Sequence, residues 1–147
     1  MDILCIIPGR SGSKGLKNKN IQKINGSTLI EIAYNVAKKS KIFEDIILST
    51  DSKKYLQLIS DKNLEKPFLR PKKLASDKTT DLQLMIYELK KYESYFEKKY
   101  DYICLLQPSS PLRKIKHIKS CFEILKKSKP DAIWTVSEVD NKFHPIK

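Results

Sequence analysis

A basic, glycine-rich loop is the first feature of the sequence that could do chemistry. It covers residues 8–20 and contains three glycines, two serines and four lysine or arginine residues. Glycine lets a backbone approach a ligand closely and point its N–H groups at it. Lysine and arginine supply positive charge for phosphate oxygens, and arginine can bind two of them at once. The loop therefore predicts phosphate binding, with a solvated surface turn as the alternative.

The spacing of the glycines excludes two common nucleotide-binding motifs. Gly9, Gly12 and Gly15 are three residues apart throughout. A Walker A loop requires G-x-x-x-x-G-K followed by Ser or Thr, and the dinucleotide fingerprint requires G-x-G-x-x-G. The loop is therefore expected to bind phosphate in another way.

Short apolar segments predict the strands that position this loop. Residues 3–7 are continuously apolar, which is typical of a parallel strand covered on both faces, and Pro8 ends the run. Residues 46–48, 102–106 and 132–136 are interpreted as further strands, and residues 62–77 as irregular chain.

Amphipathic segments between these strands predict four helices. Thr28 with Glu31, and Thr80 with Gln83, have the spacing of a capping box. The expected apolar faces are Leu29, Ile32, Ala33, Val36 and Ala37; Tyr55, Leu56 and Ile59; Leu82, Met85, Ile86, Leu89 and Phe96; and Ile115, Ile118, Cys121, Phe122 and Leu125. Alternating strands and helices predict an α/β fold with a mostly parallel sheet, in which ligands bind outside the carboxyl ends of the strands.

The composition limits the classes of partner. The net charge of +12 would attract polyanions, but the charge is spread over the chain and only three of 29 basic residues are arginine. Basic residues are not interleaved with aromatic ones, so no specific nucleic-acid partner is expected. No apolar run reaches 18 residues and no signal peptide is evident, so we expect a cytoplasmic protein with no membrane partner.

The cysteines and histidines do not predict a zinc site. Cys5 and Cys104 lie inside apolar runs and are expected to be buried thiols. No two cysteines have ligand spacing, and His117 and His144 are isolated.

Three segments of the sequence together resemble one enzyme family. Residues 7–21, IPGRSGSKGLKNKNI, resemble the signature opening of the acylneuraminate cytidylyltransferases, which include CMP-sialic acid synthetases and relatives acting on legionaminic and pseudaminic acids. Residues 69–77, with LRP leading to LASD, and residues 105–113, LLQPSSPLR, resemble two further segments in the same order. Gly9 departs from the family, which commonly has alanine there.

The resemblance implies a fold and an activity. The fold would be the Rossmann-like nucleotide-diphospho-sugar transferase fold, incomplete at the C-terminus. Residues 1–147 would be the nucleotide-binding part of a single cytidylyltransferase domain without its C-terminal sugar, metal and dimerisation part. The activity would be transfer of CMP from CTP to an acidic nine-carbon sugar with release of pyrophosphate, for cell-surface glycans. Turnover by this chain alone would be weak or absent, and full-length relatives would be homodimers.

The resemblance also assigns residues. Arg10 and Lys19 would be catalytic by contacting the CTP phosphates, and Arg70, Ser76 and Gln107 would read the cytosine and its surroundings. Lys147 would face the sugar carboxylate. The complete nucleotide-binding set would be Arg10, Gly12, Ser13, Lys14, Gly15, Lys19, Asn20, Arg70, Ser76 and Gln107.

Other roles for these residues remain open. Arg70 could brace the irregular segment, Gln107 could cap the end of its strand, and Ser76 could begin the third helix. Arg113 is expected to stabilise its loop or the following helix rather than to touch ligand.

No metal ligand is assigned. Mg²⁺ is the expected cofactor, with ligands beyond the end of the chain, and Asp51, Asp77 and Asp81 are expected to act as helix caps. Two alternative functions remain: a noncatalytic CTP-binding module and a cytidylyltransferase for the eight-carbon sugar KDO. The KDO family favours Ser-x-Arg-Phe-Pro-Gly-Lys in the first loop, which this chain lacks.

Overall fold

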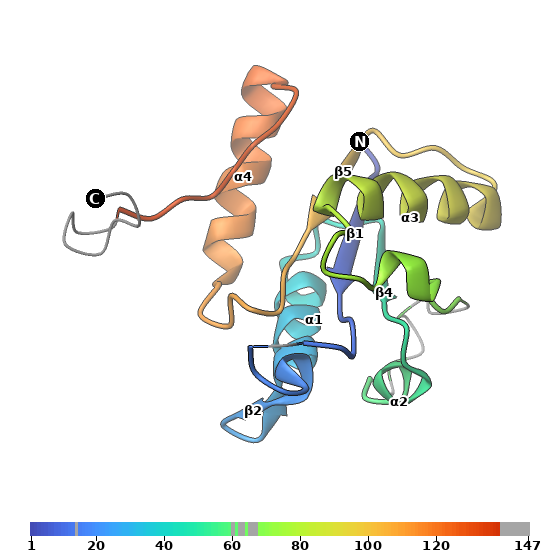
Figure 1. Cartoon of the computed structure of the whole chain (residues 1–147). Helices are drawn as coiled ribbons and strands as arrows, with labels where there is room; N and C mark the ends of the chain where they lie inside the picture. Colours follow the sequence, from blue (N-terminus) through green and yellow to red (C-terminus); the bar gives the residue numbers. More distant parts are fainter. Residues whose placement is uncertain (14, 60, 62–63, 65–67, 139–147) are drawn as a thin grey trace, which may run out of the picture.

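Three parallel strands form the centre of the fold (Figure 1). They are β1 (Ile3–Pro8), β4 (Asp45–Ser49) and β5 (Tyr102–Leu105), in the order β4-β1-β5. The structure is a computed structural model that describes residues 1–13, 15–59, 61, 64 and 68–138. The parallel sheet and its flanking helices confirm the predicted α/β fold class.

The central strand packs a different helical layer on each face. Cys5 and Ile7 belong to a core cluster with residues of α1 (Leu29–Ser40) and α4 (Ile115–Ser128). Leu4 and Ile6 point the other way and share a cluster with Tyr92 of α3 (Asp81–Phe96). The continuous apolar run of β1 is therefore explained by burial on both faces of the sheet.

Capping boxes set the beginnings of α1 and α3, as predicted. The Thr28 hydroxyl accepts from the Glu31 N–H, and the Glu31 carboxylate accepts from the Thr28 N–H. Thr80 and Gln83 make the same reciprocal pair at the start of α3. Each pair satisfies two N–H groups that have no partner within the helix.

The predicted apolar face of α3 is partly wrong. Leu82 and Ile86 are 62% and 45% exposed, whereas the buried residues of the helix are Leu84, Glu88 and Tyr92. These three are spaced by four residues and form one stripe. The prediction missed this stripe because one of its members is a glutamate, which an apolar pattern does not count.

The remaining elements are short. They are β2 (Lys23–Ile24), β3 (Ser27–Thr28), α2 (Lys53–Leu56) and the 3₁₀ turns η1 (Lys19–Ile21) and η2 (Lys72–Leu74). The two small strands form a hairpin whose turn residues Asn25 and Gly26 both have positive φ. Asn-Gly is the usual signal for such a turn. The helix predicted to reach Ile59 ends at Leu56.

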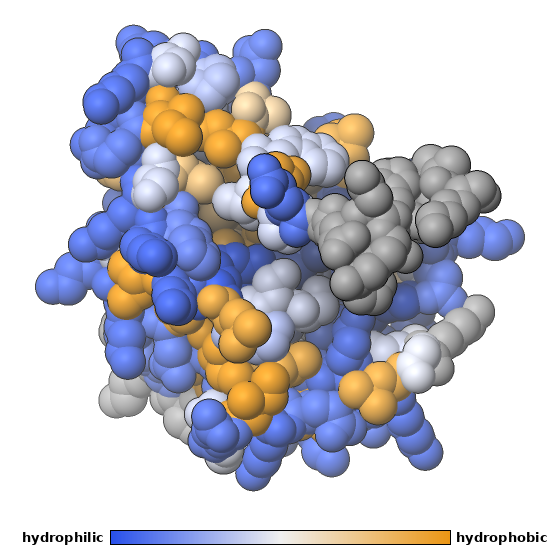
Figure 2. Space-filling model, turned by 90° about the vertical axis from the view of Figure 1, so that its left-hand side faces the viewer, coloured by the Kyte–Doolittle hydropathy of each residue, from blue (hydrophilic) through white to orange (hydrophobic). Residues whose placement is uncertain are grey.

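The predicted last strand is absent from the described structure. Residues 132–136 make no pairing with the sheet, and the side chains of Trp134 and Val136 are 85% and 89% exposed. A strand requires a neighbour to pair with its N–H and C=O groups, and the described part of the chain offers none to this segment. Figure 2, which faces the α4 side of the molecule, shows hydrophobic patches among hydrophilic side chains.

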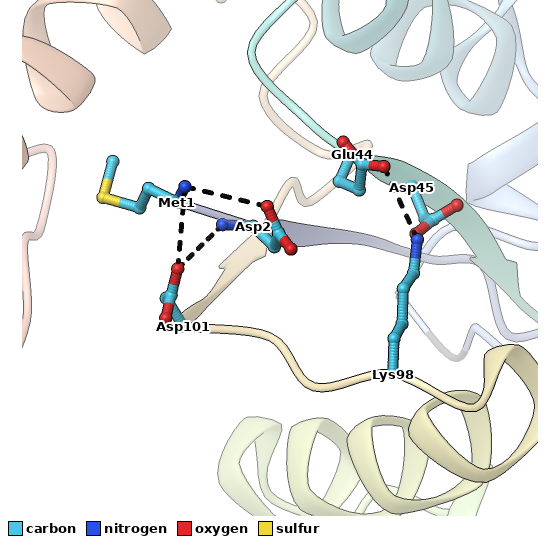
Figure 3. Close-up of polar contacts among 6 residues, drawn as sticks. All are labelled: Met1, Asp2, Glu44, Asp45, Lys98 and Asp101. Carbon is cyan, nitrogen blue, oxygen red and sulfur yellow. Dashed lines mark hydrogen bonds and ion pairs between the residues drawn. The ribbon is translucent and has the colours of Figure 1, made fainter.

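A polar cluster closes the amino end of the sheet (Figure 3). The terminal amino group lies 3.7 Å from an Asp2 oxygen and 3.8 Å from an Asp101 oxygen, and the Asp2 N–H donates to Asp101 over 2.9 Å. Lys98 pairs with Asp45 and, over 3.7 Å, with Glu44. We call these six residues, together with Tyr100, the amino-edge cluster.

Candidate functional site

A cavity of about 720 Å³ opens at the carboxyl edge of the sheet. Its walls come from the loop after β1, the segment around Arg70, the start of α3 and the loop after β5. The volume lies within the range typical of small-molecule sites. Strands that end at a common edge bring loops far apart in the sequence to one ligand site.

The cavity brings together most of the residues predicted to bind a nucleotide. Eight of them line it: Arg10, Ser13, Gly15, Lys19, Asn20, Arg70, Ser76 and Gln107. Gly12 is exposed and is not among the lining residues. Lys14 and Lys147 lie outside the described residues.

Asp51 and Asn20 hold the first loop in place. The Ser11 N–H donates to one Asp51 carboxylate oxygen over 2.8 Å, and the Ser11 hydroxyl donates to the other over 2.9 Å. The buried Asn20 amide donates to the Arg10 carbonyl over 3.0 Å. The prediction that Asp51 caps a helix is therefore wrong, because its carboxylate orders the basic loop instead.

Arg10 reaches across the cavity entrance to the segment before α3. Its guanidinium forms an ion pair with Asp77 and donates to the Ala75 carbonyl over 3.4 Å. Asp77 therefore does not cap α3, whose N-cap is Thr80. The Ser76 hydroxyl lies 3.2 Å from that of Thr79 and is exposed. These contacts hold Arg10 beside the segment that contains Ser76, and both residues line the cavity.

The guanidinium of Arg70 is held by Ser49, at the end of β4. Its Nε donates to the Ser49 hydroxyl oxygen over 2.9 Å, and its Nη2 donates to the Ser49 carbonyl over 2.6 Å. The Ser49 hydroxyl in turn donates to the Glu88 carboxylate of α3. Arg70 and Glu88 are only 6% and 3% exposed. Arg70 thus braces its segment, as one of the open alternatives held, and also lines the cavity.

Burial acts on the pKa values of both charged members of this network. It lowers the pKa of Arg70, while the Glu88 and Asp51 carboxylates act in the opposite direction. Burial raises the pKa of Glu88, while the Ser49 hydroxyl and Arg70 counteract it. A buried charge is tolerated only with partners of this kind.

Gln107 is held through both its backbone and its side chain. The Arg113 guanidinium donates to the Gln107 carbonyl over 3.3 Å, which confirms that Arg113 stabilises its own loop. The Gln107 Nε2 donates to the Asp81 Oδ2 over 2.8 Å. Asp81 lies in the first turn of α3 rather than at its cap, so the predicted capping role is wrong for this aspartate as well.

The residues that hold Arg70 in place were not predicted from the sequence. Ser49 and Glu88 carry no motif, although a glutamate four residues from Leu84 and Tyr92 on a helix could have been noticed as a buried partner for a cation. Thr79, Thr80 and Ser109 also line the cavity without a predicted role.

The acidic side chains near the cavity are the candidate metal ligands of the site. Within the described residues, no group of three or more His, Cys, Asp or Glu side chains is arranged to hold a metal ion. Asp51, Asp77 and Asp81 are each engaged by other residues of the site. No helix in the described part of the chain has the length and apolarity needed to cross a membrane.

The sequence is similar to proteins of one family along nearly its whole length. A family described as "Cytidylyltransferase" matches residues 4–147. The "Post-translational flagellin modification protein B" of Campylobacter coli is 38% identical over 134 residues, which cover 91% of this chain and 57% of that protein. An "N-acylneuraminate cytidylyltransferase" of Streptococcus agalactiae is 35% identical over 147 residues, which cover 99% of this chain and 34% of that protein.

The fold is similar to that of solved nucleotidyltransferases. A CMP:2-keto-3-deoxy-manno-octonic acid synthetase in complex with CTP superposes with a TM-score of 0.67 over 88% of this chain and 49% of that one, at 17% identity. This likeness concerns the fold alone. The chain spans about half or less of the length of these proteins.

Proposed function

The chain belongs to the cytidylyltransferase family, and on that premise we propose that its cavity binds CTP for transfer of CMP to an acidic nine-carbon sugar. The observation that carries the proposal is the convergence of the basic loop, Arg70 and Gln107 on one cavity at the carboxyl edge of the sheet. The loop offers cations for a triphosphate, and Gln107 offers an amide for a base. A solvated surface turn would need neither the cations nor the amide, and a site for phosphate alone would not need the amide.

Arg10 and Lys19 would bind the phosphates in this assignment. Both line the cavity, and both come from the loop that Asp51 and Asn20 hold in place. Because the loop is already ordered, little conformational entropy remains to be lost when the triphosphate binds. Ser13 and Gly15 would place backbone N–H groups beside the same phosphates, and Lys14 would add a further charge.

The reaction would be an in-line displacement at phosphorus. The anomeric hydroxyl oxygen of the sugar would attack the α-phosphorus of CTP and lose its proton to solvent. The bond between the α-phosphorus and the oxygen that bridges to the β-phosphorus would break, and pyrophosphate would leave with the electron pair. Arg10 and Lys19 would stabilise the charge that develops on the phosphate oxygens. Bound Mg²⁺ would add charge neutralisation on the phosphates. Lys147 would bind the sugar carboxylate.

The wider assignments follow from the same proposal. The sugar would be of the N-acylneuraminate type, the metal would be Mg²⁺, and full-length relatives would be homodimers. We place the protein in the cytoplasm, where CTP is available to it, with neither a nucleic acid nor a membrane as partner.

Calorimetric titration of the purified 147-residue chain with CTP and with UTP, at fixed salt and with Mg²⁺, tests the nucleotide assignment. We expect CTP to bind more tightly than UTP. Arg10→Ala should weaken both nucleotides about 100-fold, because hydrogen bonds to charged groups contribute about 1.5–3 kcal/mol each. Gln107→Ala should reduce the preference for CTP and leave the contribution of the phosphates intact.

Lys39→Ala is the matched control for charge. Lys39 is an exposed lysine of α1 that does not line the cavity. Its removal changes the net charge by the same amount as Arg10→Ala. Equal weakening by Lys39→Ala and Arg10→Ala would reduce the binding to general electrostatic attraction and would exclude the assignment. A folded chain that binds CTP and UTP equally would exclude it as well.

A further inference from the structure

The side chain of Gln107 is held in one orientation by a residue with no assigned role. Its Nε2 donates to the Asp81 Oδ2 over 2.8 Å, although the two residues are 26 positions apart. Gln107 follows β5, and Asp81 begins α3. Both line the cavity at the carboxyl edge. The contact therefore joins two walls of the proposed nucleotide site.

The chemistry of the pair fixes which end of the amide faces which way. A carboxylate only accepts hydrogen bonds, so the NH₂ group of Gln107 must face Asp81. The carbonyl oxygen Oε1 then lies on the opposite side of the planar amide. The backbone of Gln107 is also held, because the Arg113 guanidinium donates to its carbonyl over 3.3 Å. The hydrogen bond to Asp81 therefore prevents rotation of the Gln107 amide.

We propose that Asp81 is a positioning residue for base selection: it fixes the Gln107 amide so that Oε1 faces the base as a hydrogen-bond acceptor. This inference rests on the proposed function. Cytosine carries an amino group at position 4, which donates to an acceptor, whereas uracil carries an oxygen there, which an acceptor repels. A freely rotating glutamine could accept from the amino group of cytosine or donate to the oxygen of uracil. It would therefore select poorly between the two bases.

The pair discriminates because the wrong base leaves polar groups without partners. With Oε1 fixed toward position 4, uracil would set two acceptor oxygens against each other, and neither could donate to the other. To bind UTP, the amide would have to rotate and lose its bond to Asp81. Only UTP binding requires this rotation, so only the affinity for UTP is lowered by it. Asp81 therefore acts on the preference between bases rather than on phosphate binding.

Asp81→Asn tests the proposal in the 147-residue chain. An asparagine can accept from the Gln107 NH₂ or donate to its Oε1, so both amide orientations become available with nearly the same volume. The probes are CTP, UTP and the triphosphate of the pyrimidin-2-one riboside, which has only hydrogen at position 4. Affinities in the unmodified chain should fall in the order CTP, pyrimidin-2-one, UTP.

In Asp81→Asn the CTP-to-UTP affinity ratio should fall about tenfold, mainly through tighter UTP binding, as expected for one hydrogen bond. The affinity of the pyrimidin-2-one nucleotide should stay within about twofold, because it has no group at position 4 to be read. Asp131→Asn, which removes an exposed carboxylate beyond α4, should leave the ratio unchanged. Circular dichroism of each variant confirms that it is folded.

The outcomes separate this inference from the proposed function. A CTP-selective unmodified chain whose ratio is unchanged in Asp81→Asn would overturn the positioning role and leave the nucleotide assignment standing. Equal falls in Asp81→Asn and Asp131→Asn would overturn it too, because the effect would then be one of net charge. An unmodified chain without preference for CTP would overturn both.

Discussion

The charged residues at the two ends of the three strands have different kinds of partner. At the amino end, the amino-edge cluster pairs its own charges: Lys98 binds Asp45, and the terminal amino group lies between Asp2 and Asp101 (Figure 3). At the carboxyl end, Arg70 lines an open cavity instead, and Arg10 combines both arrangements because it lines the cavity and also pairs with Asp77. The supporting polar residues there, Ser49 and Glu88, are buried beneath it.

The difference teaches how one sheet can be stable at one end and reactive at the other. Charges that neutralise each other stabilise a surface modestly and leave little to offer a ligand. Charges held by buried partners can face a cavity without collapsing onto one another. Substitutions at the carboxyl end should therefore change both stability and nucleotide binding, whereas those at the amino end should change stability alone.

Glu88→Ala should have the largest effect. It leaves Arg70 buried beside Ser49 without the carboxylate that most opposes the effect of burial on its pKa, and we expect a loss of about 3 kcal/mol in the free energy of unfolding. Urea denaturation measures it, and CTP affinity should fall with it. Glu88→Gln, which can still accept from Ser49, should lose less. A loss no greater than that in Glu123→Ala, at an exposed α4 position, would contradict the supporting role.

Asp45→Ala should weaken the amino end alone. The Tyr100 hydroxyl donates to the Asp45 carboxylate over 2.6 Å, and Lys98 pairs with the same group. Leaving a partly buried hydroxyl without its acceptor should cost about 2 kcal/mol in the free energy of unfolding. The Kd for CTP should remain within about twofold of the original. A large change in Kd would show that the two ends of the sheet are not independent of each other.

Gly9→Ala should show how tightly the first loop is joined to the core. A Cβ at this position would lie 2.9 Å from the Ile30 Cδ1 and 3.3 Å from the Leu48 Cδ1. We expect a loss of about 1 kcal/mol in unfolding free energy from overpacking, and a small fall in CTP affinity. The loss should shrink in an Ile30→Val background, which lacks the Cδ1 atom. Additive losses in the double-mutant cycle would exclude the contact as the cause.

The pH dependence of the amino-edge cluster should give the smallest effect. Burial would lower the pKa of Lys98, but the Asp45 hydrogen bond and the nearby carboxylates outweigh it, and the net shift is upward. Burial and Asp45 also raise the pKa of Tyr100. Groups that hold their protons more tightly when folded stabilise the fold fully below their ordinary pKa values, near 10. That stability is lost as pH rises through the folded values.

Urea denaturation of the original chain and Lys98→Met between pH 7 and pH 11 tests this dependence. The original chain should be more stable by about 0.5 kcal/mol at pH 7. That difference should diminish as the pH rises beyond about 10.4, the ordinary pKa of lysine. Lys39→Met, at an exposed α1 position, should show no such trend. If the difference in unfolding free energy between the original chain and Lys98→Met grew with pH, it would contradict the predicted direction of the pH dependence.

Local signals predicted much of the fold correctly. The capping boxes at Thr28 and Thr80 begin α1 and α3, because their spacing satisfies helix N–H groups whatever the rest of the chain does. The apolar run of β1 was predicted for a similar reason, since burial on both faces leaves a continuous pattern. Five predicted residues of the first loop also line one cavity with Arg70 and Gln107: Arg10, Ser13, Gly15, Lys19 and Asn20.

Features that depend on distant partners could not be predicted in the same way. The buried stripe of α3 includes Glu88, which is explained only by Ser49 and Arg70 on other elements. Asp51, Asp77 and Asp81 resemble caps in the sequence, but their partners Ser11, Arg10 and Gln107 are remote in the chain. The segment 132–136 has the composition of a strand, yet pairing also requires a neighbour.

The central position of β1 has a consequence for synthesis on the ribosome. β1 is made first, and its partner β5 follows about a hundred residues later; Asp2 and Asp101, at their amino ends, are 99 positions apart. At translation rates of about 5–20 residues per second, this apolar strand waits on the order of 5–20 s for its second neighbour. Such high contact order slows folding and exposes the nascent chain to aggregation. The strand that carries the basic loop is thus exposed to aggregation until its second neighbour has been made.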